Sequence, residues 1–236
     1  MGIAMNNPAP AATIRVLCTN GLKSVFEAIG PELTRKTGVG FSAEYGSTLK
    51  FTDRIVGGDV PDLVILTDEA IDKLTVSGQL AGKRMDIAQS FIGVAVRKGA
   101  PRPDIGSKAA FIQTLRNASS IARSRLGASG QHFGKLLEQF GLADELASKI
   151  SAYDGMAGQM CAEGKHEIAI QQISELMPVE GIDIVGPLPD EIQKVSIFSA
   201  GVGANTSQRA AAERFVAYVK SRDCDGILRD KGLEPA

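Results

Sequence analysis

Short apolar runs, many of them β-branched, alternate along the chain with longer segments in which apolar residues recur every three or four positions. The short runs are typical of buried strands, and the longer amphipathic segments are typical of helices. The pattern predicts strands over residues 14–18, 39–45, 63–67, 91–97, 120–124, 149–153, 168–172 and 195–202. It predicts helices over residues 23–37, 49–56, 68–77, 108–117, 131–140, 156–163 and 208–220. This alternation favours an α/β fold on largely parallel sheets.

A turn rich in Gly and Pro, residues 98–104, interrupts the alternation after the fourth predicted strand. We expect the chain to cross there from a first lobe into a second. The predicted first lobe comprises residues 12–90 and 200–236, and the second comprises residues 91–199. The segments 90–97 and 195–202 are then the two crossings that act as the hinge.

The composition is that of an ordinary globular protein, with 44% hydrophobic and 22% charged residues among 236. The 26 Lys and Arg residues nearly balance the 27 Asp and Glu residues, so no basic surface is expected to hold nucleic acid. The longest apolar runs are too short for a membrane span, which needs about 20 residues.

The first residues lack the basic start and apolar stretch of a secretory signal. A chain made in this form is expected to stay in the cytoplasm. A second Met at position 5 and a short polar leader are equally typical of a processed mature chain. Both interpretations stay open.

Cys18, Cys161 and Cys224 are far apart, form no CxxC motif and accompany two histidines only. This spacing argues against a disulfide framework or a zinc site, and we expect the cysteines to be packed as small apolar residues. The sequence predicts no metal and no cofactor.

Four turns that follow predicted strands carry small hydroxyl, amide or glycine residues. In an open α/β sheet, ligands bind beyond the carboxyl ends of the strands, where helices begin with unpaired N–H groups. Several such helix starts can together hold an anion without Lys or Arg. The alternative is that these residues are ordinary helix N-caps. The residues concerned are Thr19, Asn20, Ser47, Thr48, Ser129, Gly155 and Met156.

Other chemistries have weaker support. No GxGxxG motif follows the first predicted strand and no GxxxxGK[ST] motif occurs, which disfavours a nucleotide site. Gly127 precedes Ser129 by two positions, but Gln131 stands where a nucleophile elbow requires Gly, so a serine hydrolase is disfavoured.

The order of several motifs resembles the molybdate-binding-protein-like substrate-binding proteins, which have the type II periplasmic binding fold. The resemblance runs from about residue 14 to 235. Its motifs are Ile-Arg-Val-Leu-Cys-Thr-Asn at 14–20, Glu-Tyr-Gly-Ser-Thr at 44–48, Asp-Val-Pro-Asp-Leu-Val-Ile-Leu-Thr at 59–67, Gly-Ala-Ser-Gly at 127–130, Glu-Ile-Ala-Ile-Gln-Gln-Ile-Ser-Glu-Leu at 167–176 and Phe-Ser-Ala-Gly-Val at 198–202.

The resemblance implies two lobes, each a mostly parallel sheet flanked by helices, with a small anion in the cleft between them. It implies that the chain is the solute-binding component of an ABC-type transporter, located in the periplasm, with a permease as its partner. The ligand contacts that it implies are the strand-end residues named above. Two departures argue against molybdate itself. Thr19 and Asn20 stand where the molybdate binders have a serine, and Gln171 and Gln172 occupy the region of a tyrosine, where Gln171 is the expected ligand contact.

Arg123 and Arg125 lie at the end of the strand that leads into the third loop, and Arg123 is expected to contact the ligand. A guanidinium suits a carboxylate better than a tetrahedral oxyanion. The alternative is that these arginines are solvated surface residues.

Some proteins of this type resemble isomerases of small tricarboxylates, with aconitate isomerase as the example. Such an enzyme needs a general base beside the anion, with a pKa near the working pH. The sequence offers His132, in the first turn of the helix after Ser129, and Tyr45 as the leading candidates, with Glu44 and Asp154 at strand ends as further ones. Binding of a small anion leads, and the isomerase is the alternative.

Overall fold

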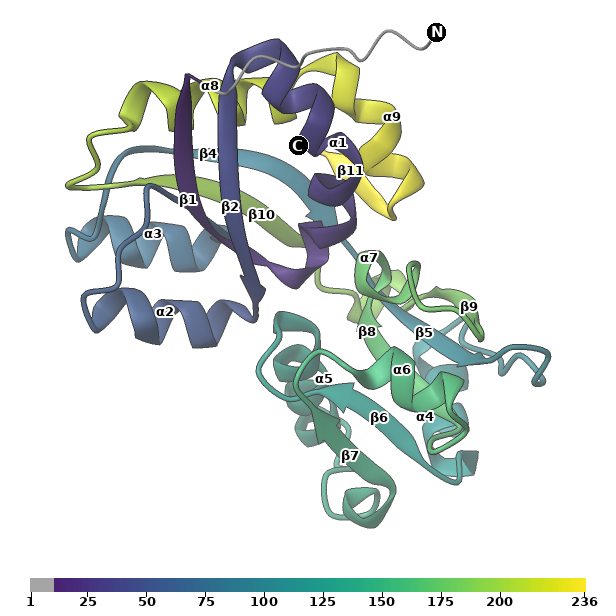
Figure 1. The fold of residues 1–236 in the computed structure, drawn as a ribbon. Coiled ribbons are helices and arrows are strands. Elements are labelled where there is room, and N and C mark those ends of the chain that lie inside the picture. The colour runs from purple at the N-terminus through teal and green to yellow at the C-terminus, as the bar shows by residue number, and fades with distance from the viewer. Residues whose placement is uncertain (1–10) are drawn as a thin grey trace, which may run out of the picture.

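The computed structural model describes residues 11–236, so the polar leader considered above lies outside the described residues. Figure 1 shows two lobes, each built on one sheet with helices against both of its faces. The first sheet has the strand order β11-β4-β10-β3-β1-β2, and the second has the order β7-β6-β8-β5-β9. The expected two-lobe α/β fold is confirmed.

The first lobe combines the N-terminal and C-terminal parts of the chain. Helices α1, α8 and α9 cover one face of its sheet, around Phe26 and Phe215, and α2 and α3 cover the other face, around Phe51. Its elements are β1 (Ala12–Thr19), η1 (Asn20–Leu22), α1 (Lys23–Thr37), β2 (Val39–Gly46), α2 (Thr48–Val56), β3 (Leu63–Thr67), α3 (Asp68–Val76), β4 (Leu80–Ser90), β10 (Ser196–Gly203), α8 (Arg209–Val219), α9 (Arg222–Asp230) and β11 (Leu233–Pro235).

The second lobe is formed by one continuous stretch of chain. Phe111 and Phe133 pack on one face of its sheet, and Met160 and Leu176 pack on the other. Its elements are β5 (Ile92–Arg97), α4 (Lys108–Asn117), β6 (Ile121–Ser124), α5 (Ala128–Gln139), η2 (Ala147–Lys149), β7 (Ile150–Tyr153), α6 (Ala157–Ala162), β8 (Ile168–Gln172), α7 (Ile173–Leu176), β9 (Ile182–Pro187) and η3 (Asp190–Ile192).

The sequence pattern missed β4, β9, β11, α7 and α9, and it began α5 three residues too late. The strand β4 was not predicted because the charged residues Arg84 and Asp86 interrupt its apolar pattern. The two side chains pair with each other, with 2.7 Å between Arg84 Nε and Asp86 Oδ1. β10 pairs antiparallel with β3 and β4, and β5 pairs antiparallel with β8 and β9. Both sheets are therefore mixed, whereas the sequence analysis expected mostly parallel ones.

The chain passes between the two sheets twice, once after β4 and once before β10. Gln172 connects the two passages, because its Oε1 accepts a hydrogen bond from Ser90 Oγ (2.9 Å) and its Nε2 donates one to Ser196 Oγ (3.0 Å). Gln193 makes a second connection, since its Oε1 accepts from the N–H of Ile92 (3.0 Å) and its Nε2 donates to the Ile92 carbonyl (2.9 Å). Two glutamine side chains thus connect the segments that pass between the lobes.

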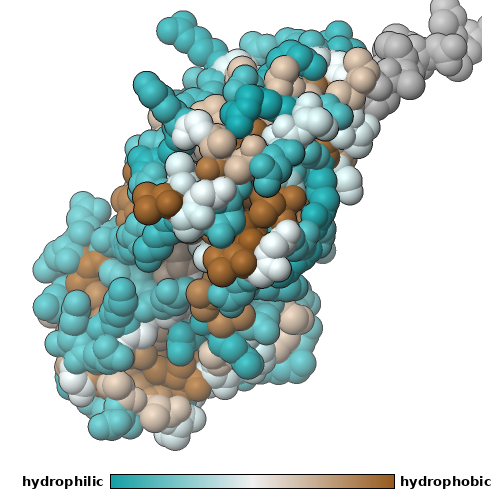
Figure 2. Space-filling model, turned by 90° about the vertical axis from the view of Figure 1, so that its left-hand side faces the viewer, coloured by the Kyte–Doolittle hydropathy of each residue, from teal (hydrophilic) through white to brown (hydrophobic). Residues whose placement is uncertain are grey.

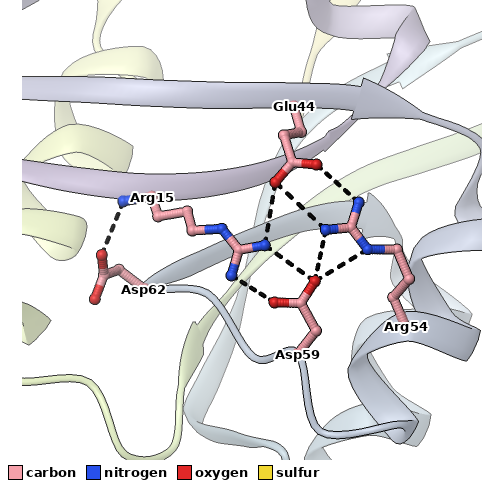
Figure 3. Close-up of polar contacts among 5 residues, drawn as sticks. All are labelled: Arg15, Glu44, Arg54, Asp59 and Asp62. Atoms are coloured by element: carbon pink, nitrogen blue, oxygen red, sulfur yellow. Dashed lines mark hydrogen bonds and ion pairs between the residues drawn. The ribbon is translucent and has the colours of Figure 1, made fainter.

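Ion pairs fasten α2 to the strands beside it, as Figure 3 shows. Arg15 on β1 and Arg54 on α2 both donate to Asp59, with 3.0 Å between Arg54 Nε and Asp59 Oδ2. Both arginines also reach Glu44 on β2, with 2.8 Å between Arg54 Nη1 and Glu44 Oε2. The four side chains form a partly exposed network on one side of the first lobe.

The three cysteines are buried and carry free thiols. Burial raises the pKa of the Cys161 thiol to about 11, so this thiol stays protonated at neutral pH. They are packed as small apolar side chains, as the sequence analysis expected.

Hydrophilic side chains dominate the face of the molecule in Figure 2, and the hydrophobic ones gather in separate small patches. The apolar side chains that reach the surface include Val56 and Val76, near the ends of α2 and α3. No helix in the described part of the chain has the length and apolar character that a membrane span requires.

Candidate functional site

A cavity of about 240 Å³ lies between the lobes, at the carboxyl ends of strands from both sheets. Its wall is mixed, with hydroxyl, amide and backbone groups beside a few apolar side chains. The lining residues are Thr19, Asn20, Tyr45, Gly46, Ser47, Thr48, Lys50, Ser124, Leu126, Gly127, Ala128, Ser129, Asp154, Gly155, Gln172, Glu175 and Phe198.

Two helices begin at this cavity. Ser47 caps α2, with its Oγ accepting from the N–H of Lys50 at 3.3 Å, and Gly127 is the N-cap of α5. The first N–H groups of a helix have no partner within it and carry the positive end of the helix dipole. One helix comes from each lobe, so an anion between them would receive donors from both.

Ser129, in the first turn of α5, is fully buried, and its Oγ has no hydrogen-bond partner among the described residues. A buried hydroxyl without a partner costs about 1–3 kcal/mol. Because Ser129 also lines the cavity, this free hydroxyl can donate to a bound anion.

The close approach of α5 to β6 depends on Gly130. A Cβ at this position would lie 1.7 Å from the carbonyl oxygen of Ser124, so only glycine fits. Arg123 stabilises the same turn, because its Nη1 donates a hydrogen bond to the Gly130 carbonyl at 3.0 Å. Arg123 does not line the cavity, and burial lowers the pKa of its guanidinium.

Asn20 of the first lobe and Gly155 of the second lie opposite each other across the cleft. Gly155 has a φ of +76°, and a Cβ there would lie 3.0 Å from Asn20 Nδ2. The cavity therefore narrows at this point, and the narrowing separates it from a second interlobe cavity of about 310 Å³ that both residues also line.

Glu175, on α7, brings a carboxyl group to both cavities. Gln171 Nε2 donates to Glu175 Oε2 at 2.8 Å, and Gln171 Oε1 accepts from the N–H of Gly158 at 3.2 Å. Burial raises the pKa of the Glu175 carboxyl to about 7, although the hydrogen bond from Gln171 favours the ionised form.

The expected bases lie in different surroundings. Tyr45 lines the cavity, but burial raises the pKa of its phenol, so at neutral pH it is a hydrogen-bond donor. His132 lines another cavity, of about 200 Å³, and its Nε2 lies 2.8 Å from the carbonyl of Ile192. Because a carbonyl only accepts, that nitrogen carries the proton.

The two carboxylates considered beside them each lie close to an arginine. Glu44 lies in the surface network of Figure 3, where hydrogen bonds from Arg54 and Arg15 lower its pKa. Asp154 lines the cavity, and its Oδ1 lies 3.6 Å from Arg125 Nε in an exposed pair.

Of the ligand contacts expected from the sequence, six line the cavity and three do not. Arg123 supports the backbone, Gln171 is buried behind Glu175, and Met156 is half exposed at the start of the six-residue helix α6. The six that line the cavity are Thr19, Asn20, Ser47, Thr48, Ser129 and Gly155.

The sequence analysis missed Glu175, Gln172, Lys50, Ser124, Leu126 and Phe198 among the lining residues. Glu175 had a usable signal, because it follows the end of strand β8 by three residues, as the other loop residues follow their strands. Within residues 11–236, no group of three or more His, Cys, Asp or Glu is arranged to hold a metal ion.

Comparison with known proteins gives consistent results. The profile of the bacterial extracellular solute-binding proteins matches residues 14–234. An aconitate isomerase of Pseudomonas sp. is 34% identical over 234 residues, which cover 96% of this chain and 89% of that protein. The molybdate-binding protein ModA of Mycobacterium tuberculosis is 22% identical, covering 94% of this chain and 85% of its own length.

The fold is also that of solved binding proteins. The periplasmic molybdate-binding protein of Azotobacter vinelandii superposes with a TM-score of 0.78 at 19% identity, over 93% of this chain and 98% of that one. At this identity the superposition shows the shared two-lobe fold.

Proposed function

The chain belongs to the bacterial extracellular solute-binding proteins, and from this premise we propose that its interlobe cavity binds a small anion and acts on it as an isomerase of a small tricarboxylate. The observation that carries the proposal is the buried, unpartnered hydroxyl of Ser129 beside the start of α5, opposite the start of α2. Buried polar groups are almost always paired, so this hydroxyl indicates a missing partner.

The donors favour an anion of modest charge density. Lys50 is the single cationic side chain in the lining, and the other donors are hydroxyl, amide and backbone N–H groups. A charge-assisted hydrogen bond contributes about 1.5–3 kcal/mol. A handful of them suffices for micromolar affinity, which corresponds to about −8 kcal/mol.

The relative named aconitate isomerase supports the isomerase over simple binding. It is 34% identical to this chain, against 22% for the molybdate-binding relative, and the match extends over 96% of the chain. The cavity also contains Glu175, a carboxyl that a cavity for tetrahedral oxyanions does not need.

Transport is the second candidate function, and the family match supports it. In this case the chain would deliver a small anion to an ABC-type permease. The same match supports an extracellular or periplasmic location. Neither candidate function requires a cofactor.

A thermal-shift panel tests the proposal, with molybdate, tungstate, sulfate, phosphate, citrate and both aconitate isomers. At 100 times its dissociation constant a ligand stabilises the fold by about 2.7 kcal/mol. For a protein of this size we expect the melting temperature to rise by about 5–11 °C.

The panel is followed by NMR of cis- and trans-aconitate incubated with the protein. Stabilisation by a tricarboxylate together with interconversion supports the isomerase. Stabilisation by tetrahedral oxyanions alone would favour transport, and no stabilisation by any of the anions would contradict an anion site.

A further inference from the structure

Glu175 lies in the wall that two interlobe cavities share, together with Asn20, Asp154 and Gly155. On one side lies the cavity with the starts of α2 and α5, and on the other lies the 310 Å³ cavity bordered by Lys23, Ser24 and Glu27 of the first lobe. A group in this position can touch a molecule in the first cavity and exchange protons with water entering the second.

Gln171 fixes the orientation of the Glu175 carboxyl. Gln171 is buried, holds Oε2 at 2.8 Å and is itself held by the N–H of Gly158. Among the described residues no hydrogen bond ends on Oε1. One oxygen is therefore anchored, and the other is free to accept a proton.

We propose that Glu175 is the catalytic residue that moves a proton between two carbons of an unsaturated carboxylate bound in the first cavity. This inference rests on the proposed isomerase function and assigns its chemistry to one atom, Glu175 Oε1. The substrate class is a small polycarboxylate with a CH₂ group next to a carbon–carbon double bond.

The proposed step balances without any co-reactant. The Glu175 carboxylate takes a proton from the CH₂ carbon, and the electron pair of that C–H bond forms a new double bond to the neighbouring carbon. The old double bond shifts its electrons toward the adjacent carboxylate. The Glu175 carboxylic acid then returns the proton to the far carbon, so the double bond has moved by one position.

The surroundings of the cavity suit the charge that this step creates. During the shift, negative charge grows on a substrate carboxylate, and donors that are already oriented stabilise such charge. The free hydroxyl of Ser129 and the first turns of α2 and α5 are donors of this kind. Glu175 and these donors line the same cavity.

The pH dependence follows from the groups around Glu175. Burial raises its pKa to about 7, and the groups that face it are Asp154 and Lys50 across the first cavity and Lys23 and Glu27 across the second. Two of these neighbours are acidic and two are basic, so their effects on the pKa of Glu175 oppose each other. We expect kcat/KM to rise with pH and to level off above about pH 7, as the base becomes ionised.

The test is E175Q, which keeps the size of the side chain and removes the base. We expect kcat for aconitate interconversion to fall by at least about 100-fold, the usual contribution of a general base. The thermal shift with the tricarboxylate should persist. In D₂O the wild type should place deuterium on the CH₂ carbon of the substrate, and the variant should not.

The control is E180Q, an exposed glutamate shortly after α7, which should keep the wild-type rate. E175A is the second variant, in case glutamine disturbs the fold, and because it also lacks the carboxylate it should lower kcat at least as far while binding remains. A wild type that interconverts the isomers and a folded E175Q or E175A variant that matches it would overturn this inference alone. A wild type that interconverts no such substrate would overturn the proposed isomerase, and this inference with it.

Discussion

The hydroxyl of Ser129 lowers the stability of the fold, and the proposed function gives it a role in binding. Its hydroxyl is fully buried, without a partner among the described residues, at the start of α5. A residue retained for stability alone would pair this hydroxyl or replace it by a methyl group. The cost in the empty protein is therefore evidence for a ligand that supplies the partner.

We expect S129A to weaken anion binding by about tenfold or more, because one hydrogen bond to a charged group is lost. The melting temperature of the empty protein should stay the same or rise, since an unpaired buried hydroxyl disappears. Calorimetric titration and thermal unfolding measure the two effects. In the double variant with S47A the affinity should fall further.

Ser107 is the matched control for S129A. It caps α4, away from the cavity, and its Oγ accepts from the N–H of Ala110 at 3.2 Å. S107A should lower stability by about 1 kcal/mol, as loss of a helix cap does, and leave affinity unchanged. Unchanged affinity in S129A would show that the site is wrongly placed.

Glu175 should make stability depend on pH. Its pKa rises from an ordinary value of 4.5 to about 7 in the fold, so the folded state holds a proton that the unfolded state has lost between these values. Stability is then greatest below pH 4.5 for this group and falls as pH rises through 7. The penalty above pH 7 is at most about 3 kcal/mol.

E175Q should therefore be more stable than the wild type at pH 8, and the difference should vanish near pH 4.5. Denaturant unfolding at both pH values measures it. An equal difference at both values would mean that the Glu175 carboxyl has an ordinary pKa.

The sequence predicted well which residues lie at the ends of strands beside the cavity. It predicted less well which side chains at those positions point into the cavity. Ser47 and Ser129 follow strand ends, and parallel strands bring such ends together. Neighbours on a strand point to opposite faces, so Gln172 reaches the cavity whereas Gln171 does not. The pattern alone did not reveal which of the two would face inward.

At the scale of elements, the βαβ units and the antiparallel strands β5 and β10 were readable, whereas the antiparallel strands β4, β9 and β11 were not. The strands β1 and β3 contain short apolar runs, and β2 alternates half-buried and exposed positions. An amphipathic helix follows each of the three strands. β4 contains Asp86, which pairs with Arg84 of the same strand and accepts from Ser199 Oγ of β10 at 2.7 Å. β9 ends at Pro187 in a segment rich in Gly and Pro. Their stability comes from partners distant in the sequence, which a local pattern does not contain.

The ion pairs that hold α2 give a prediction for this element. Hydrogen bonds from Arg15 and Arg54 lower the pKa of Asp59 from 3.8 to about 2. The stabilisation is present above pH 4 and is lost as pH falls toward 2. D59N should lower stability at pH 7, and by no more than about 1 kcal/mol, because the pairs are partly exposed to water.

Unfolding in urea at pH 7 and pH 3, for the wild type and D59N, measures this contribution. The gap between the two proteins should narrow at the lower pH, because part of the stabilisation is lost between pH 4 and pH 2. A gap that stays constant would assign the effect to packing of the introduced amide side chain instead of to charge.

At the scale of the whole molecule, Asn20 of the first lobe and Gly155 of the second approach each other across the interlobe cavity. G155A places a methyl group 3.0 Å from Asn20 Nδ2. We expect about tenfold weaker ligand binding, since the arrangement with both helix starts on the anion is disfavoured. Calorimetric titration measures the loss.

Gly99 provides the control for the backbone effect. It has a φ of +78°, close to that of Gly155, and a Cβ there would meet nothing within 4 Å. G99A should carry the same backbone cost of about 1 kcal/mol without a change in affinity. Equal affinity losses in G99A and G155A would argue against a role of the interlobe contact.

The place of β10 between β3 and β4 has a consequence for how the protein is made. During synthesis, β10 leaves the ribosome only after the complete second lobe. Until then, the edges of β3 and β4 that pair with β10 have no partner, although the second lobe can already fold. Open edges recruit other chains into aggregates. The nascent chain is thus most in need of a chaperone in the interval between the appearance of β4 and that of β10.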